Sequence, residues 1–332
     1  MWQILGAGFL IWLANRLFSD SGEPTFKISR KSDCSKEFVD FAQNLDLTAN
    51  KKRALKQAKD VIQQKIVEYF KGLEWKNGTT TWRAKSTFFI QGSQKHGTSI
   101  RTQQDVSDID LGVYFEGRPP ISPLALQQNL YRALVGHTSL PVSIKNKCVR
   151  VKYTNLFHID LPIYYYDSQE KKYFLGVKDE WIESDPKAFT DWVATHIKPV
   201  EQKLRILRYF KAWSDNTRRK NSIKMPSGVA FTVWINAFYV KDSREDIAFI
   251  KTAYQILKHL TDQRVNNWKC EMPVMPFDNL IAKLNDDQRN NFLRSLSELI
   301  KSSESILALD HREQAVYAWQ KLFGKWFPEY NY

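Results

Sequence analysis

The sequence predicts an α+β fold, in which a domain built on a mixed sheet is followed by a C-terminal helical domain. The chain has 332 residues, 43% of them hydrophobic, which is enough for a large buried core. Short β-rich runs bounded by Gly, Ser and Asp follow one another between about residues 86 and 177. From about Pro186 onward, apolar residues instead recur at helical spacing.

The first segment, residues 2–18, is apolar over most of its length and reads WQILGAGFLIWLANRLF. It is near the lower limit of the roughly 17–25 residues that cross a bilayer. A cleaved signal peptide is not indicated, because a basic start and a small-residue cleavage site are missing. Residues 1–22 therefore form either a membrane anchor or an apolar helix packed on the protein's own core. Basic residues such as Arg16 and Lys27 follow, so an anchor would tether a cytoplasmic protein to the inner membrane.

Residues 23–185 are predicted to form the first folded domain. Its long helix begins after Thr48, a suitable N-cap, and ends at Gly72. One apolar stripe runs along this helix, at Leu55, Ala58, Ile62, Ile66 and Tyr69. The β-rich runs then occupy residues 86–93, 108–115, 140–146, 148–167 and 171–177.

The second domain, residues 186–332, is predicted to be helical. Its boundary falls at the run WIESDPK, residues 181–187. Helical periodicity is present at residues 185–196, 200–216, 227–240, 246–260, 286–309 and 312–324.

Charge and cysteine content limit the classes of function. The formal net charge is +13, which favours polyanionic partners such as nucleotides, nucleic acid or an anionic membrane surface. The three cysteines, Cys34, Cys148 and Cys270, lie far apart without a Cys-x-x-Cys or Cys/His cluster. This excludes a zinc ribbon and a disulfide framework, and it agrees with a reducing, cytoplasmic setting.

Three aspartates in β-rich runs point to metal-ion chemistry. In DIDLGVYF, Asp108 and Asp110 share one face of the predicted strand, because side chains alternate with a period of two. Asp160 lies in a second apolar run, FHIDLPIYYY, which a neighbouring strand could place beside the pair. Carboxylate oxygens suit Mg²⁺ or Mn²⁺, and three such groups would hold two ions. The alternative is that Asp108 caps a turn and Asp110 lies on a solvated strand face.

A Gly-Ser pair lies fifteen residues before this strand, in FFIQGSQKHGTSIRTQQDVSDIDLGVYF. Gly92 would allow a backbone N–H to approach an anion, and Ser93 could donate to a phosphate oxygen. The residues between Ser93 and Asp108 fit a short helix followed by a loop. The pattern therefore predicts a phosphate-binding turn opposite the carboxylates.

These residues resemble the polymerase-β-like nucleotidyltransferase superfamily. The combination is Gly92-Ser93, then Gly97-Thr98, Asp108-x-Asp110 and a later strand with Asp160. More narrowly, the chain is similar to the bacterial cyclic-oligonucleotide synthases related to cyclic GMP-AMP synthase and oligoadenylate synthase, which act in anti-phage (CBASS) signalling. The similarity spans residues 45–330 and includes HIDLPIYYYD, EWIESDPKAF, RYFKAWSDNTRRKNSIKMPSG and AWQKLFGKWFP.

The resemblance implies a role for each matching residue. Asp108, Asp110 and Asp160 match the aspartates that bind two Mg²⁺ or Mn²⁺ ions. The residues that match nucleotide-binding positions are Gln91, Gly92, Ser93, Lys211 and Ser227, with Arg208 as an alternative to Lys211. The chain departs from the family at His96, where many relatives carry Arg. It also lacks the zinc-binding insertion of the animal double-stranded-DNA sensors.

The activity that the resemblance implies is the joining of NTPs into a cyclic di- or trinucleotide with release of pyrophosphate. The product would activate a separate effector, and RNA is a candidate activator. Two alternatives stay open: a linear oligonucleotide or RNA-tailing transferase, and a catalytically inactive membrane-tethered nucleotide or RNA sensor. A basic cluster, Lys203, Arg205, Arg208 and Lys211, is either a solvated helix face or a set of phosphate contacts. The basic run TRRKNSIK is expected to be a surface loop.

Overall fold

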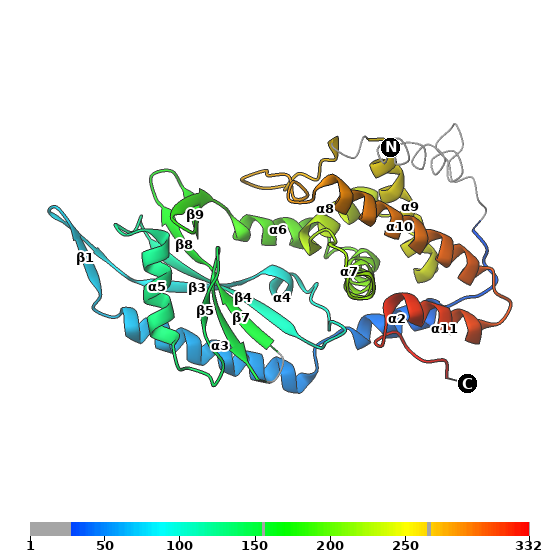
Figure 1. The fold of residues 1–332 in the computed structure, drawn as a ribbon, viewed down its shortest axis with the longest axis horizontal. Coiled ribbons are helices and arrows are strands. Elements are labelled where there is room, and N and C mark those ends of the chain that lie inside the picture. The colour runs from blue at the N-terminus through cyan, green and yellow to red at the C-terminus, as the bar shows by residue number, and fades with distance from the viewer. Residues whose placement is uncertain (1–27, 155–156, 264–266, 332) are drawn as a thin grey trace.

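The computed structural model describes residues 28–154, 157–263 and 267–331, and it arranges them as a sheet lobe beside a helical lobe (Figure 1). The strands are β1 (Glu74–Asn77), β2 (Thr80–Arg83), β3 (Ser86–Gln91), β4 (Ser107–Glu116), β5 (Ser143–Ile144), β6 (Val149–Tyr153), β7 (Phe157–Leu161), β8 (Ile163–Asp167), β9 (Lys172–Val177) and β10 (Glu180–Glu183). The helices are α2 (Ser35–Asn44), α3 (Ala49–Phe70), α4 (Gly92–His96), α5 (Pro123–Leu134), α6 (Pro186–His196), α7 (Glu201–Asn221), α8 (Gly228–Phe238), α9 (Glu245–Thr261), α10 (Asp286–Leu307) and α11 (Arg312–Phe323).

The predicted apolar helix at residues 1–22 lies outside the described residues, so both of its interpretations stay predictions. Between residues 28 and 331, apart from the gaps at 155–156 and 264–266, no helix has the length and apolar character needed to cross a membrane.

The main sheet is mixed, as the sequence predicts, and β4 lies at its centre. Strand β3 pairs antiparallel with β4 on one side, while β7 and β8 pair parallel with it on the other. β7 and β8 lie end to end and contact opposite halves of β4 because Pro162, which has no N–H to donate, separates them. The outer strands complete the order β10-β9-β8-β4-β7-β6-β5.

Alternation along β4 gives the sheet one apolar face and one polar face. Ile109, Leu111 and Val113 are buried in a core cluster that also contains residues of α3 and α5. Asp108 and Asp110 alternate with these residues and therefore point from the opposite face. The same alternation holds in β7, where Phe157, Ile159 and Leu161 are buried.

Helix α3 confirms the predicted long helix at the back of the sheet. The Thr48 hydroxyl accepts a hydrogen bond from the Lys51 backbone N–H at 3.3 Å, which is the expected N-cap. The apolar stripe is the predicted one except at its last position. Phe70, four residues after Ile66, is buried there, whereas Tyr69 is only partly buried.

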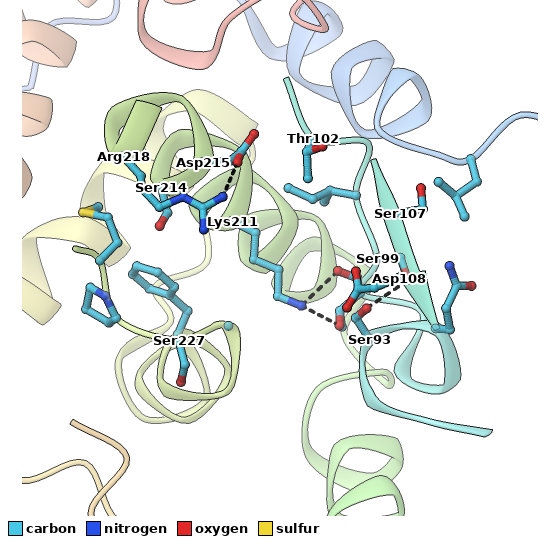
Figure 2. A pocket seen from close by; sticks show the side chains of 18 residues that line it. Ser93, Ser99, Thr102, Ser107, Asp108, Lys211, Ser214, Asp215, Arg218 and Ser227 are labelled. Atoms are coloured by element: carbon cyan, nitrogen blue, oxygen red, sulfur yellow. Dashed lines mark hydrogen bonds and ion pairs between the residues drawn. The ribbon is translucent and has the colours of Figure 1, made fainter. Parts of the chain in front are cut away.

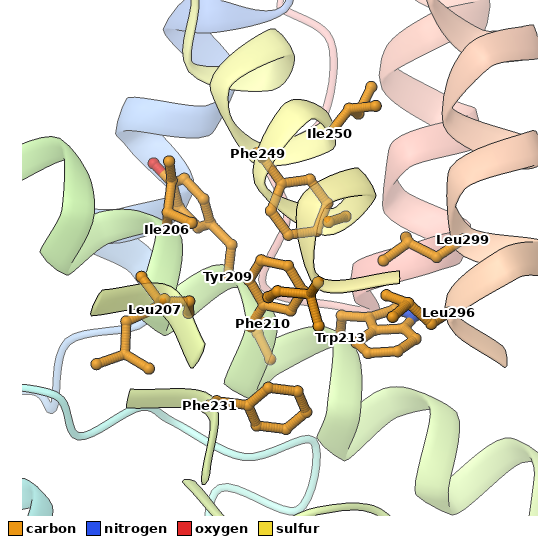
Figure 3. Packing of buried hydrophobic residues seen from close by; sticks show 14 of the residues in the cluster. Ile206, Leu207, Tyr209, Phe210, Trp213, Phe231, Phe249, Ile250, Leu296 and Leu299 are labelled. Carbon is orange, nitrogen blue, oxygen red and sulfur yellow. The ribbon is translucent and has the colours of Figure 1, made fainter. Parts of the chain in front are cut away.

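The helical lobe confirms the predicted all-helical second half, and it also contains α2. Phe38 and Phe41 of α2 pack with Tyr209, Phe249 and Phe323 from three other helices. Figure 3 shows Tyr209 and other apolar side chains of α7 packed with Phe249 of α9 in this core. The predicted domain boundary at residue 185 stays a prediction. The hydrophobic core of the helical lobe also includes α2, which precedes that boundary in the sequence.

One helix end differs from the prediction. Helix α7 continues to Asn221, so the first half of TRRKNSIK is helical and not part of a surface loop. The reason is that the C-terminal part of α7 packs against α11, whose Lys321 carbonyl accepts a hydrogen bond from Lys220 in the last turn of α7. The Asn216 side-chain amide donates to the carbonyls of Lys321 and Leu322, at 3.2 and 2.7 Å.

The loop between α4 and β4, residues 97–106, is fastened to the helical lobe. The Gln103 backbone N–H donates to Asp215 at 2.7 Å, and its side-chain amide donates to the Phe323 carbonyl at 2.9 Å. The Trp326 indole N–H donates to the Thr102 carbonyl at 2.9 Å. Because this loop leads directly into β4, the C-terminal segment helps to position the strand that carries Asp108 and Asp110.

Replacing Gly324 with alanine should therefore destabilise the protein. Gly324 has a φ of +85°, and an added Cβ would overlap the Gln103 side-chain amide. We expect Gly324→Ala to lower the free energy of unfolding by about 2 kcal/mol or more. Gly136→Ala is the matched control, because its φ is +75° but its Cβ would meet open space. The control should lose only about 1 kcal/mol. Equal losses in urea unfolding would contradict this role of the Gln103 contact.

Candidate active site

The three predicted aspartates lie on adjacent strands and the same face of the sheet. Asp110 of β4 is the register partner of Asp160 on β7, and Asp108 is the partner of His158. Side chains opposite each other in neighbouring strands point the same way, so the three carboxylates lie on one face of neighbouring strands, as the sequence predicts. Their role as metal ligands stays a prediction.

The surroundings of Asp110 destabilise the ionised form of its carboxyl group. Burial, together with the charges of Asp108 and Asp160, raises its pKa from 3.8 to about 7. A carboxylate held among other carboxylates in a partly buried position favours either a proton or a metal ion. Oxygen donors are the ligands that Mg²⁺ and Mn²⁺ prefer, so Asp108 and Asp110 fit such an ion.

Asp160 has a different partner. Arg150 on β6 is its register neighbour and donates from Nε to Oδ1 at 2.6 Å and from Nη2 to Oδ2 at 2.7 Å. Among the described residues, no group of three or more His, Cys, Asp or Glu side chains is gathered closely enough to hold a metal ion. The Arg150 contact with both oxygens of Asp160 gives a physical reason for this. In this arrangement, Asp108 and Asp110 form the more accessible ion site.

Gly92 allows the turn before α4 to lie directly against Asp110. Its φ is +67°, and a Cβ at this position would overlap the Asp110 carboxylate. The predicted need for glycine is thus explained by a carboxylate close to the backbone. Ser93 follows in α4, and its hydroxyl accepts a hydrogen bond from Ser99 at 3.3 Å.

Lys211 crosses from the helical lobe to the sheet lobe. Its ammonium group donates to the Thr98 carbonyl at 3.0 Å and to the Thr98 hydroxyl at 2.8 Å (Figure 2). Burial lowers the pKa of Lys211 to about 8, although the nearby charge of Asp108 opposes this shift. Lys211 is therefore a cation close to Asp108, and its hydrogen bonds go to the two neutral oxygens of Thr98.

Two pockets meet at these residues. Pocket A has a volume of about 330 Å³, and pocket B has a volume of about 450 Å³. Both are lined by Ser93, Thr98, Asp108, Lys211 and Gly228. Pocket A is rich in hydroxyl groups, several of which are labelled in Figure 2: Ser93, Ser99, Thr102, Ser107, Ser214 and Ser227.

Ser227 lines pocket A, and its predicted contact with donor phosphates stays a prediction. It is the N-cap of α8, and its hydroxyl oxygen accepts a hydrogen bond from the Ala230 backbone N–H at 3.2 Å. The hydroxyl proton stays available for a ligand in pocket A. The following residue, Gly228, leaves space for Lys211, whose Cε would lie 2.9 Å from an added Cβ.

Gln91 lies at the edge of pocket B, but its side-chain amide is occupied. Its Nε2 donates to the Tyr164 hydroxyl and its Oε1 accepts from the Tyr114 hydroxyl, both at 3.0 Å. The two tyrosine rings stack with centroids 4.7 Å apart. The geometry therefore favours an orienting role for Gln91 at the end of β3, and the predicted direct contact with a nucleotide stays a prediction.

The four basic residues of the cluster on α7 have different interaction partners. Arg205 pairs with Glu245 and Arg208 pairs with Asp46, each at 2.6 Å, while Lys203 donates to the His196 carbonyl at 3.0 Å. Of the four, Lys211 is the one that lines both pockets. This favours Lys211 over Arg208 as the phosphate contact.

The structure adds site residues that the sequence analysis did not single out. Ser107 is buried against pocket A, and its hydroxyl has no hydrogen-bond partner among the described residues. Asp215 and Arg218 form an ion pair of 2.7 Å at the far end of the pocket. These residues and Arg150 lie within runs quoted above, but nothing in those runs distinguishes them individually, so the sheet register and the packing of α7 reveal them.

His96 lines pocket B as a neutral side chain. Its ring Nε2 lies 3.2 Å from the Thr190 hydroxyl, and its ring packs edge-on against Phe189. Burial and the nearby Lys211 lower its pKa to about 4, so it is neutral at physiological pH. In this chain, His96 joins α4 to α6.

Comparison with known proteins agrees with this architecture. Residues 86–164 match the family model of the DncV-like cyclic GMP-AMP synthase nucleotidyltransferase domain. A cyclic GMP-AMP synthase of Escherichia albertii is 31% identical over 189 residues, which span 52% of this chain and 42% of that protein.

Solved structures share the fold over most of their length. Vibrio cholerae DncV bound to 3′-deoxy GTP has a TM-score of 0.76 at 18% identity, covering 90% of this chain and 96% of the other. DncV with its linear intermediate 5′-pppA(3′,5′)pG has a TM-score of 0.75 at 18% identity, with coverages of 91% and 98%. The Bradyrhizobium diazoefficiens CD-NTase CdnG bound to GTP has a TM-score of 0.68 at 16% identity, with coverages of 87% and 94%.

The fold is thus that of a polymerase-β-like nucleotidyltransferase with a C-terminal helical region. The match at residues 86–164 identifies a segment similar to the DncV-like nucleotidyltransferase domain, and the structural matches show that most of the chain shares the fold of DncV and CdnG. The chain spans less than half the length of the curated relative that it matches.

The charge state of Asp110 predicts how stability depends on pH. Its folded pKa of about 7 lies above the ordinary 3.8, so the folded protein binds this proton more tightly than the unfolded chain. Stability is therefore lost as the pH rises from about 4 to 7. Asp110→Asn removes this cost, and in metal-free buffer at pH 8 we expect its melting temperature to exceed the wild type by about 2 °C or more.

Two comparisons test this expectation by thermal unfolding. The gain for Asp110→Asn should shrink as the pH approaches 4. Asp60→Asn, on the exposed face of α3, should show no pH-dependent gain because its side chain is 53% exposed. A lower melting temperature for Asp110→Asn at pH 8 would show that the ionised carboxylate is stabilised by its surroundings.

Proposed function

We propose that the protein is a metal-dependent nucleotidyltransferase that joins NTPs into a cyclic di- or trinucleotide for anti-phage signalling. The observation that carries this proposal is the register of Asp110 with Asp160 beside Asp108, opposite Ser93 and Lys211. The adjoining pockets A and B offer space for a donor and an acceptor nucleotide. Purines are the first substrates to test, because the relatives include a cyclic GMP-AMP synthase and structures bound to GTP.

Each residue has a task that follows from its chemistry. Divalent ions held by Asp108 and Asp110, with Asp160, would activate the attacking hydroxyl and neutralise charge on the leaving pyrophosphate. Lys211 and the hydroxyls of Ser93 and Ser227 would bind the donor's phosphate oxygens from both lobes. The protein's own contribution is then to position the two nucleotides and to supply fixed charge.

Closing the ring requires a second round at the same site. After the first bond forms, the linear intermediate must turn so that its own hydroxyl attacks its remaining α-phosphate. This agrees with pockets that adjoin at Asp108 and Lys211, because either nucleotide can then reach Asp108. The product would act on a separate effector protein.

The decisive experiment is product analysis. Purified protein is incubated with the four NTPs and Mg²⁺ or Mn²⁺, treated with phosphatase, and its products are identified by mass spectrometry. We expect a phosphatase-resistant cyclic nucleotide that is lost by about 10³-fold or more in Asp108→Asn/Asp110→Asn, because metal ions supply several kcal/mol of charge stabilisation. Linear products or extended RNA would instead indicate a tailing enzyme, and nucleotide binding without product would indicate a sensor.

A second prediction concerns Lys211. Replacing it with methionine removes a charged donor from both pockets while keeping the length of the side chain. We expect GTP affinity, measured by equilibrium dialysis with Mg²⁺, to fall about tenfold or more, since a hydrogen bond to a charged group contributes roughly 1.5–3 kcal/mol. Lys203→Met is the matched control on the same helix and should stay within about twofold of the wild type. Equal losses would show that the effect comes from total charge and not from the position of Lys211.

A further inference from the structure

Arg150 completes a row of charged side chains across three strands. Asp110 on β4, Asp160 on β7 and Arg150 on β6 are consecutive register partners, so their side chains lie side by side on one face. Arg150 belongs to the strand that flanks β7 on the side opposite to β4. It therefore contacts Asp160 from the side away from Asp110.

The contact between Arg150 and Asp160 is a bidentate, charge-assisted pair of hydrogen bonds. Two guanidinium nitrogens bind the two carboxylate oxygens in parallel, at 2.6 and 2.7 Å. The Asp160 side chain is only 13% exposed and that of Arg150 31%, so water screens the pair weakly. Both oxygens of Asp160 are thus engaged by protein.

We propose that Arg150 is a built-in competitor for Asp160, which a divalent ion must displace before it can use all three carboxylates. This rests on the proposed function, in which the three aspartates bind metal ions. Asp108 and Asp110 form the first ion site. A further ion that requires Asp160 binds the free protein more weakly, because the Arg150–Asp160 contact must break. Arg150 is a positioning residue in this scheme, since it acts through Asp160.

The neighbouring row supplies a matched control. Lys152 lies two residues from Arg150 on the same face of β6, and it is the register partner of His158, not of a carboxylate. Replacing Lys152 removes the same unit of positive charge at nearly the same place. Any general effect of charge on cation binding therefore appears in Lys152→Gln, while the effect of releasing Asp160 appears only in variants of Arg150.

The test is a titration of the full-length protein with Mn²⁺ alone, without nucleotide, in which free Mn²⁺ is measured by electron paramagnetic resonance. We expect Arg150→Gln to raise the affinity for the weaker ion at least about fivefold over Lys152→Gln, equivalent to about 1 kcal/mol. Arg150→Lys keeps the charge but not the two-pronged contact, so its affinity should rise at least about twofold over the wild type. This second variant decides the question if Arg150→Gln does not fold.

The outcomes separate this inference from the proposed function. If Arg150→Gln matches Lys152→Gln, or Arg150→Lys matches the wild type, Arg150 does not compete for Asp160 and the inference is wrong. Asp108→Asn/Asp110→Asn should abolish Mn²⁺ binding. If that double variant binds Mn²⁺ like the wild type, the carboxylates are not the metal site, and the metal-dependent function and this inference both fail.

Discussion

Repulsion among three carboxylates on one face of a sheet is the constraint on which this site depends. Asp110 is in register with Asp160 and shares its strand face with Asp108, so its negative charge cannot be balanced locally without a cation. Two basic side chains lie next to these carboxylates. Arg150 binds Asp160 from β6, and Lys211 reaches toward Asp108 from the helical lobe. Burial is the largest cause of the raised pKa of Asp110, the charges of Asp108 and Asp160 add to it, and Arg150 opposes it.

The two lobes must hold a constant relative position for this balance to work. Lys211 contributes its charge only because Thr98, in the loop before β4, accepts its hydrogen bonds. The same loop is tied to α7 through Gln103 and Asp215 and to the C-terminal segment through Trp326. One loop thus links the turn at Gly92 and Ser93, the strand that carries Asp108 and Asp110, and the helical lobe. The aromatic core around Phe38 and Tyr209 gives that lobe a rigid base.

Those parts of the site that depend on local pattern could be predicted from the sequence. The alternation in DIDLGVYF placed Asp108 and Asp110 on one face, and the apolar run around Asp160 indicated a buried strand nearby. The alternation in VRVKY, residues 149–153, likewise indicated a strand, but it did not indicate that Arg150 would lie beside Asp160. The importance of Arg150 comes from strand register, a non-local property that depends on how β6 and β7 pair.

Contacts between residues that are distant in the sequence also explain which site residues could not be assigned from sequence alone. Lys203, Arg205, Arg208 and Lys211 form one cluster in the sequence, but Glu245 and Asp46 lie far from it along the chain and neutralise two of its members. Gln91 has the position of a nucleotide contact, yet its amide is bound by Tyr114 and Tyr164, which belong to separate strands. In both cases, the residue type is compatible with ligand binding, and the folded neighbours decide whether its polar atoms are available.

Two side-chain cations border the carboxylates, and each has a different relation to the proposed metal binding. The Arg150 guanidinium occupies both oxygens of Asp160, so a divalent ion would have to displace it to use the whole cluster. Lys211 instead donates to neutral oxygens of Thr98, and it can turn to phosphate without exposing a buried anion. Under the proposed function, nucleotide binding and metal binding would therefore involve separate protein cations, Lys211 for the phosphates and Arg150 for access to Asp160.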